Sequence, residues 1–333
     1  MQSKNKIKFF ITVLLLHLFI GSSSCTSNDE LKETTENPVK PNPTEPTLKN
    51  LQCTPQIEQS DYSIYKMGSN DKRIGDLMPI YDAASNKFYL YYLKDIWDDN
   101  SNQRHPWHTL STVDFSSYNE INQEILSSSS QRCDQDFAIG SGSIFVKDKV
   151  YYGFYTGHNP NFPSSCVTTK EGIMLATSTN PEAGFTKNKS FTTIYAPKGL
   201  QFDEQDNFRD PYVFEDSGTY FMLISARARV GGVFKGVLVY YTSKDLMSWK
   251  YDGIFYDGGT RNYFFMETAQ VFKMGSTYYL LYSDIDSRRV VYRKSSSATG
   301  PWVQPNGSEF LDGKDFYAAK AVSNGKDAFI MGW

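Results

Sequence analysis

The sequence predicts an all-β protein, a five-bladed β-propeller whose fifth blade is incomplete. Five times along the chain a small or acidic residue leads into an apolar strand, and a second strand soon follows. These second strands are rich in aromatic residues, as in KFYLYYL at residues 87–93 and TYYLLYSD at residues 277–284. A repeating unit that holds several short strands is typical of a propeller blade.

The five units follow one another from about residue 73 to the end of the chain. The leads into their first strands are IGDLMP (74–79), GSGSIF (140–145), FRDPYVF (208–214), FMETAQVF (265–272) and KDFYAAK (314–320). Four units carry a third strand that ends in a turn rich in Ser and Thr, at residues 110–115, 175–181, 241–249 and 294–302. The fifth unit stops inside its second strand, so its blade is expected to be incomplete, with residues 57–66 as the source of one further strand.

Residues 1–24 are predicted to be a lipoprotein signal peptide. Lysines precede the apolar stretch 9–21, which is short for a membrane span, and Ser22-Ser23-Ser24-Cys25 resembles a lipoprotein cleavage site. We expect Cys25 to carry the lipid, and residues 25–50, which are polar and Pro-rich, to form a flexible tether. The protein would then be exported and anchored in the cell envelope, at the outer membrane or cell surface, with ordinary secretion and a retained membrane anchor as alternatives.

Residues 51–333 are expected to form one large β domain. The chain has 333 residues, of which 15% are aromatic and 21% charged, and its formal net charge of −3 gives no reason to expect nucleic acid or an anionic membrane surface as a partner. The membrane is therefore expected only through the lipid anchor. Cys133 and Cys166 lie in Ser-rich stretches and are the expected disulfide pair, with Cys53 left over. No His or Cys spacing indicates a metal site, and no cofactor is expected.

The leads into the first strands hold the candidate catalytic residues. Radially arranged blades bring these leads to one end of a central channel, so we expect Asp76, Asp210 and Glu267 to meet there. Carboxylates gathered in a cleft are suited to acid/base chemistry on a glycosidic bond. Glu267 follows the apolar residues 263–266 and is expected to be the more desolvated acid, with Asp76 as its ionised partner. Each acid, like Asp315 in the fifth lead, also fits a turn or a buried ion pair, but equivalent positions on different blades argue for function.

Several blocks of the chain resemble signature segments of glycoside hydrolase family 32, the five-bladed fructan and sucrose hydrolases. These blocks are GSGS (140–143), FRDP (208–211), Met266-Glu267, DFYAA (315–319) and FIMGW (329–333). In addition, Trp107-His108 followed by STVD (111–114) is similar to the Trp-Gly-His and Ser-Thr-Asp segment of that family.

The resemblance implies a retaining glycoside hydrolase that cleaves fructosyl linkages in fructans or sucrose-type oligosaccharides. It implies that Asp76 is the nucleophile, Asp210 a stabiliser of the transition state and Glu267 the acid/base. The residues expected to contact the substrate are Trp107, His108, Ser141, Arg209 and Asp315. Because the fifth blade is open, the chain is expected to be a fragment that lacks the C-terminal β-sandwich of this family.

The chain departs from the family pattern beside two of the acids. Arg73-Ile-Gly-Asp76-Leu-Met-Pro replaces Trp-Met-Asn-Asp-Pro-Asn-Gly, and Thr268-Ala269 replaces the Cys-Pro that follows the acid/base Glu. Two other functions therefore stay open: an inverting five-bladed glycosidase for arabinan or xylan, and an inactive propeller that binds carbohydrate. The aromatic residues that suit either sugar stacking or blade packing are Trp97, Trp107, Tyr263 and Phe264.

Overall fold

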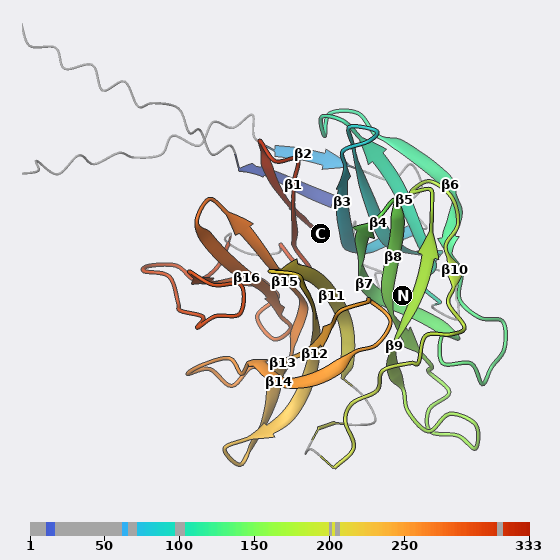
Figure 1. The fold of residues 1–333 in the computed structure, drawn as a ribbon, viewed down its shortest axis with the longest axis vertical. Helices are drawn as coiled ribbons and strands as arrows, with labels where there is room; N and C mark the ends of the chain where they lie inside the picture. Colours follow the sequence, from blue (N-terminus) through green and yellow to red (C-terminus); the bar gives the residue numbers. More distant parts are fainter. Residues whose placement is uncertain are drawn as a thin grey trace, which may run out of the picture.

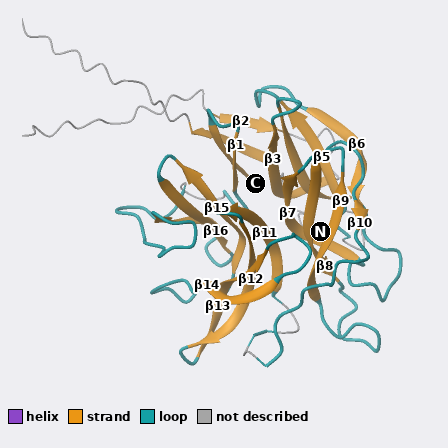
Figure 2. Cartoon of the chain, viewed as in Figure 1, coloured by secondary structure: helices purple, strands orange, loops and turns teal. Residues whose placement is uncertain are grey.

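The computed structural model describes residues 11–16, 62–65, 72–96, 104–199, 202–203, 207–311 and 316–333. Strands, turns and loops make up this part of the chain, and Figure 2 shows no helix in it. Accordingly, within the described ranges no helix is long and apolar enough to cross a membrane. The prediction of an all-β protein is confirmed.

Five antiparallel sheets stand around a common centre (Figure 1). The first contains β3 (Lys72–Asp82), β4 (Lys87–Ile96), β5 (Trp107–Thr112) and β6 (Asn119–Leu126). The second contains β7 (Ala138–Lys147), β8 (Val150–His158), β9 (Glu171–Ser178) and β10 (Thr186–Lys187). The third contains β11 (Phe208–Asp216), β12 (Thr219–Val230), β13 (Val233–Ser243) and β14 (Lys250–Tyr256). The fourth contains β15 (Met266–Met274), β16 (Thr277–Asp284) and β17 (Arg289–Ser295).

The fifth sheet combines two strands from residues 320–332 with two strands from residues 11–65. It contains β18 (Lys320–Ser323), β19 (Ala328–Gly332), β1 (Ile11–Leu16) and β2 (Tyr62–Tyr65), in that order. The expectation that residues 57–66 supply a strand to this blade is confirmed by β2. β1 falls within the apolar stretch predicted to belong to an export signal, and the structure pairs it with β19 and β2. Signal cleavage and lipidation stay predictions, since Cys25 lies outside the described residues.

The first strand of each unit lies innermost, and these strands form a closed ring. β3 lies beside β7, β7 beside β11, β11 beside β15, β15 beside β18, and β18 again beside β3. Aromatic side chains fill the space between sheets; for example, Phe115 packs on Phe329 with ring centroids 4.4 Å apart, which joins the first sheet to the fifth. Between the second and third sheets, Phe154 meets the edge of Trp249 at 5.6 Å. This packing places the starts of all the inner strands at one end of the ring.

The fourth strands β6, β10 and β14 were not expected from the sequence. They lie at the outer edges of their sheets, and β14 has no fully buried side chain. A strand of this kind lacks the apolar run by which the other strands are recognised.

A disulfide joins Cys133 to Cys166, the pair expected from the sequence, with the two Cα atoms 5.5 Å apart. It connects the segment before β7 to the loop between β8 and β9. Asn159 supports the same junction, because its side-chain amide donates to the carbonyl oxygens of Arg132 and Asp134 at 2.9 and 2.7 Å. Cys53 lies outside the described residues.

Candidate active site

A cavity of about 460 Å³ lies at the end of the ring where the inner strands begin. Asp76, Asp210 and Glu267 all line it, together with Ser141 and Arg209. The remaining lining residues are Leu93, His105, Ile139, Gly140, Thr156, His158, Lys170, Glu171 and Asn207. The structure thus brings together three acids that lie on three different blades.

A β-bulge shapes four of the inner strands, β3, β7, β11 and β15, at the cavity. The pairing register shifts between Gly75 and Met78, between Ile139 and Gly142, between Arg209 and Tyr212, and between Glu267 and Gln270. Such a bulge turns a side chain out of the ladder, and bulges are frequent beside active sites.

The bulges show that the three acids do not occupy equivalent positions, contrary to the expectation from the sequence. Asp76 and Asp210 are themselves the residues with positive φ, at 43° and 60°. In the fourth sheet that position belongs to Thr268, at 51°, and Glu267 precedes it. Glu267 therefore corresponds to Arg209 of the third sheet. A left-handed backbone at a non-glycine residue is uncommon; it occurs in turns, and inside a strand it is a feature that clusters at functional sites.

Asp76 is held by two neutral donors, one on each carboxylate oxygen. The Ser141 hydroxyl donates to Oδ2, and the indole Nε1 of Trp333 donates to Oδ1 at 2.9 Å. Because both oxygens accept hydrogen bonds from uncharged groups, the carboxylate is oriented without a cation in direct contact. An oriented, ionised carboxylate is what nucleophilic attack requires.

Glu267 has a different environment, a cation on one oxygen and a phenol on the other. Arg209 Nη2 lies 2.6 Å from Oε1, and the Tyr317 hydroxyl donates to Oε2. The Glu267 side chain is 17% exposed. Its carboxyl group is thus fixed in position while it still reaches the cavity.

Asp210 is the most desolvated of the three acids, which corrects the expectation that Glu267 would be. It is 4% exposed, its Oδ2 accepts the backbone N–H of Thr268 at 3.0 Å, and its own N–H donates to Thr156 Oγ1 at 2.9 Å. Burial raises the pKa of Asp210 to about 7; Arg209 opposes the rise, and the charges of Glu267 and Asp76 add to it. Phe265 and Met266 are fully buried, but Glu267 itself reaches the cavity, so adjacency along the chain did not predict its desolvation.

This raised pKa predicts that Asp210 weakens the fold at neutral pH. A raised folded-state pKa contributes stability that is fully present below the usual value of 3.8 and is lost as the pH rises through about 7. Asp210→Asn carries no charge and keeps an oxygen for the Thr268 N–H. We expect it to raise the Tm by a few degrees (about 2–6 °C) above pH 7, and the difference to vanish near pH 4.

Thermal unfolding of both proteins across this pH range measures the effect. Asp148→Asn is the matched control, because Asp148 lies in an exposed turn and also has a positive φ, at 49°. A Tm for Asp210→Asn below that of the unmodified protein at every pH would contradict the prediction.

Glu171 completes the charge network and was not predicted from the sequence. It accepts the Phe208 N–H at 2.7 Å, lies 3.4 Å from Arg209 Nη1 and lies 3.3 Å from His158 Nδ1. Burial favours the neutral acid, but Arg209 and His158 overcome it and lower the pKa of Glu171 to about 2. Arg209 therefore bridges two carboxylates, Glu171 and Glu267. No local motif marks Glu171, because its partners Phe208 and Arg209 lie on β11 of the neighbouring sheet.

Trp107 and His108 are not among the residues that line the cavity. They were expected to contact the substrate, but they lie at the start of strand β5. Trp107 is fully buried, meets Tyr155 at 6.0 Å and donates from Nε1 to the carbonyl oxygen of Gly140 at 3.1 Å. His108 stacks on Tyr92 with centroids 6.0 Å apart. Trp107 thus supports the Gly140-Ser141 segment from behind, and Asp315 lies outside the described residues.

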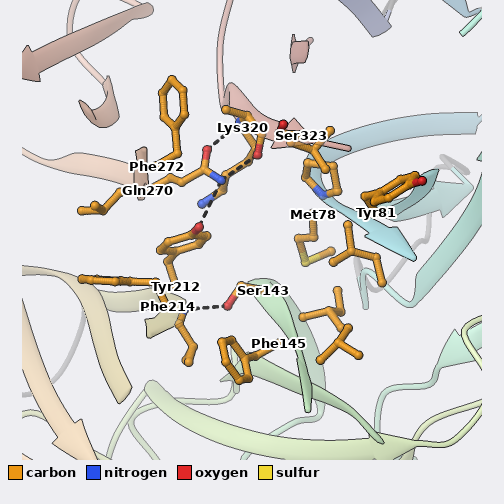
Figure 3. A pocket seen from close by; sticks show the side chains of 18 of the residues that line it. Met78, Tyr81, Ser143, Phe145, Tyr212, Phe214, Gln270, Phe272, Lys320 and Ser323 are labelled. Atoms are coloured by element: carbon orange, nitrogen blue, oxygen red, sulfur yellow. Dashed lines mark hydrogen bonds between the residues drawn. The ribbon is translucent and has the colours of Figure 1, made fainter. Parts of the chain in front are cut away.

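A second cavity, of about 500 Å³, is lined by residues further along the same inner strands (Figure 3). Lys320, Gln270 and Tyr212 extend to it from three inner strands, and Gln270 Nε2 donates to the Tyr212 hydroxyl at 3.3 Å and to the Ala321 carbonyl at 2.8 Å. Lys320 donates to the Ala269 carbonyl oxygen at 3.0 Å. Burial lowers the pKa of Lys320 to about 8, against the charges of Asp210 and Asp76. In the described part of the chain, no group of His, Cys, Asp and Glu side chains is placed to hold a metal ion.

Residues 78–333 match the family model described as the N-terminal domain of glycosyl hydrolases family 32. Raffinose invertase from Escherichia coli is 27% identical over 212 residues, which are 58% of this chain and 41% of that protein. The chain therefore spans less than half of this curated relative.

Solved structures share the fold. The Bombyx mori GH32 β-fructofuranosidase superposes with a TM-score of 0.61 at 20% identity, covering 78% of this chain and 55% of that one. Sucrose-6-phosphate hydrolase from Lactobacillus gasseri superposes with a TM-score of 0.64 at 17% identity, covering 78% of this chain and 53% of that one. An endo-arabinase from Bacteroides thetaiotaomicron superposes with a TM-score of 0.56 at 17% identity, covering 78% of this chain and 88% of that one. At these identities the superpositions show the propeller fold alone.

Proposed function

Because this chain belongs to glycosyl hydrolases family 32, we propose that it hydrolyses fructosyl linkages in fructans or sucrose-type oligosaccharides with retention of configuration. The observation that carries the proposal is the placement of Asp76, Asp210 and Glu267 in one cavity with three different environments. A retaining glycosidase needs one ionised nucleophile and one proton donor, and distinct environments are what separate such roles.

In the first step of the proposed reaction, a carboxylate oxygen of Asp76 attacks the anomeric carbon of the fructosyl unit. Glu267 transfers its proton to the oxygen of the leaving sugar as the glycosidic bond breaks. The hydrogen bonds from Ser141 and Trp333 hold the attacking group in line. The product of this step is a fructosyl ester of Asp76 and a free leaving group.

In the second step, Glu267 takes a proton from water, and the water oxygen attacks the same carbon. The ester bond breaks, Asp76 regains its charge, and fructose leaves. Asp210, oriented by Thr268, accepts hydrogen bonds from sugar hydroxyls as positive charge develops on the ring. Arg209 keeps the Glu267 carboxyl group in place through both steps.

Two alternatives have less support. The similarity to an endo-arabinase rests on the fold, whereas the family model covers most of the chain and favours a fructoside. An inactive binding propeller would have no need of a nucleophile, a stabiliser and a proton donor that are all hydrogen-bonded and directed to one cavity.

The proposal is tested by incubating the protein with sucrose, inulin and levan, and with arabinan and xylan as controls. We expect fructose to be released from at least one of the first three, and no pentose from the last two. Release of arabinose or xylose would favour the inverting glycosidases. A folded protein that releases no sugar from any of the five would overturn the proposal.

A further inference from the structure

Arginine and phenylalanine side chains alternate on the third sheet and on the loop that leads into β15, near the acid Glu267. The Arg227 guanidinium carbon lies 4.0 Å from the ring centroid of Phe264 and 4.4 Å from that of Phe234. The Arg229 guanidinium carbon lies 5.9 Å from the Phe234 ring. We call the set Phe264, Arg227, Phe234 and Arg229 the aromatic–arginine ladder.

The ladder starts beside the residues that line the active-site cavity. β11 and β12 pair Phe208 with Ala226 and Arg209 with Ser225, so continuing the register places Asn207, a cavity residue, opposite Arg227. The two positions are also linked through Asp203, whose N–H donates to the Arg227 carbonyl and whose carboxylate accepts from Asn207, both at 2.9 Å.

The loop that leads into β15 supplies the other side of the ladder. Phe264 precedes Glu267 by three residues, and the intervening Phe265 lies under the Arg209 guanidinium at 4.1 Å. Phe264 is thus next in sequence to the ring that packs on Arg209, the residue that holds Glu267. From there it continues outward along the hairpin of β12 and β13.

The ladder is exposed yet held in place. Phe264 is 45% exposed and Phe234 37%, which is unusual for side chains of this size. A guanidinium between two rings limits their motion, and each such contact stabilises the arrangement. Within the described part of the chain, Nε of Arg227 is buried without a hydrogen-bond partner. With its faces covered by rings, Arg227 has only its edge left for hydrogen bonding.

These properties suit a sugar ring. The apolar face of a sugar packs on an aromatic ring, and its hydroxyl groups accept hydrogen bonds from a guanidinium edge. Under the proposed function, on which this step rests, Glu267 protonates the leaving oxygen, so the leaving group lies on the Glu267 side of the cavity. We propose that the aromatic–arginine ladder binds a sugar unit of the leaving group, beyond the unit next to the cleaved bond, and so favours oligosaccharides over a disaccharide.

The test compares kcat/KM for sucrose with kcat/KM for fructo-oligosaccharides of three, four and five units. We expect Phe264→Ala and Arg227→Gln each to lower the value for the longer substrates about 5- to 30-fold, and to leave the value for sucrose within about twofold. Ile254→Ala, a change at an exposed site on the outer strand of the third sheet, is the matched control. An equal loss on all substrates, or no loss on any, would show that the ladder is structural and overturn the proposal.

Binding separates failure of this inference from failure of the proposed function. If the unmodified protein releases no fructose from any substrate, calorimetry with the five-unit fructo-oligosaccharide decides the matter. Binding that weakens at least about fivefold in Phe264→Ala would support the ladder as a sugar site in a protein that is not a fructosidase. Binding of equal strength in both proteins, or none in either, would refute it.

Discussion

Asp76→Asn is expected to abolish fructosyl hydrolysis, with a fall in kcat of roughly four orders of magnitude. The amide is neutral and cannot form the ester through which the proposed reaction passes. The substitution also places an NH₂ group opposite one of two donors, the Ser141 hydroxyl or the Trp333 indole, so the side chain loses part of its orientation. Steady-state rates of fructose release from the preferred substrate measure the effect.

Asp148→Asn is again the control, because it makes the same chemical change at another residue with positive φ. Trapping supplies an independent measurement: rapid acid quenching and proteolysis of the unmodified protein should yield a fructosylated peptide that contains Asp76. A folded Asp76→Asn variant that keeps more than a tenth of the activity would exclude Asp76 as the nucleophile.

Glu267→Gln is expected to lower kcat for natural substrates by about 10²- to 10⁴-fold, because the leaving alkoxide is no longer protonated. The loss should be much smaller for an aryl fructoside such as the nitrophenyl compound, whose leaving group departs as a stable anion. Gln retains an oxygen for the Arg209 guanidinium, and the Tyr317 hydroxyl is free to rotate toward the new amide. The ratio of the two rates is therefore the informative measurement.

Glu215→Gln serves as the control for this change, because Glu215 is exposed at the far end of β11 and does not line the active-site cavity. Equal losses of activity on both substrates would indicate that Glu267 acts through structure and not as a proton donor.

The departure from the family pattern after Glu267 has a structural role in this chain. Thr268 takes the left-handed position of the bulge, and its backbone N–H holds Asp210. Ala269 is fully buried, and its carbonyl oxygen accepts the Lys320 ammonium group. Both contacts are made by backbone groups. The bulge can therefore make them with Thr and Ala in place of the family's Cys and Pro.

The sequence by itself determined the propeller, the order of its blades and the three acids. Alternating apolar strands repeat with the same lead, and a radial array of such units must bring the leads to one end of a channel. Ser141 and Arg209 were expected from the resemblance to the family, and both line the cavity.

Only the tertiary structure decided the environment of each acid. Trp333, which donates to Asp76, is 257 residues away along the chain, and Arg209 is 58 residues from Glu267. The structure also buried Trp107 behind the site, added Glu171 to it and made Asp210 the most desolvated of the three predicted acids. Desolvation and hydrogen bonding depend on which side chains face each other across blades. Neighbours in sequence do not predict these contacts, because successive residues of a strand point to opposite faces.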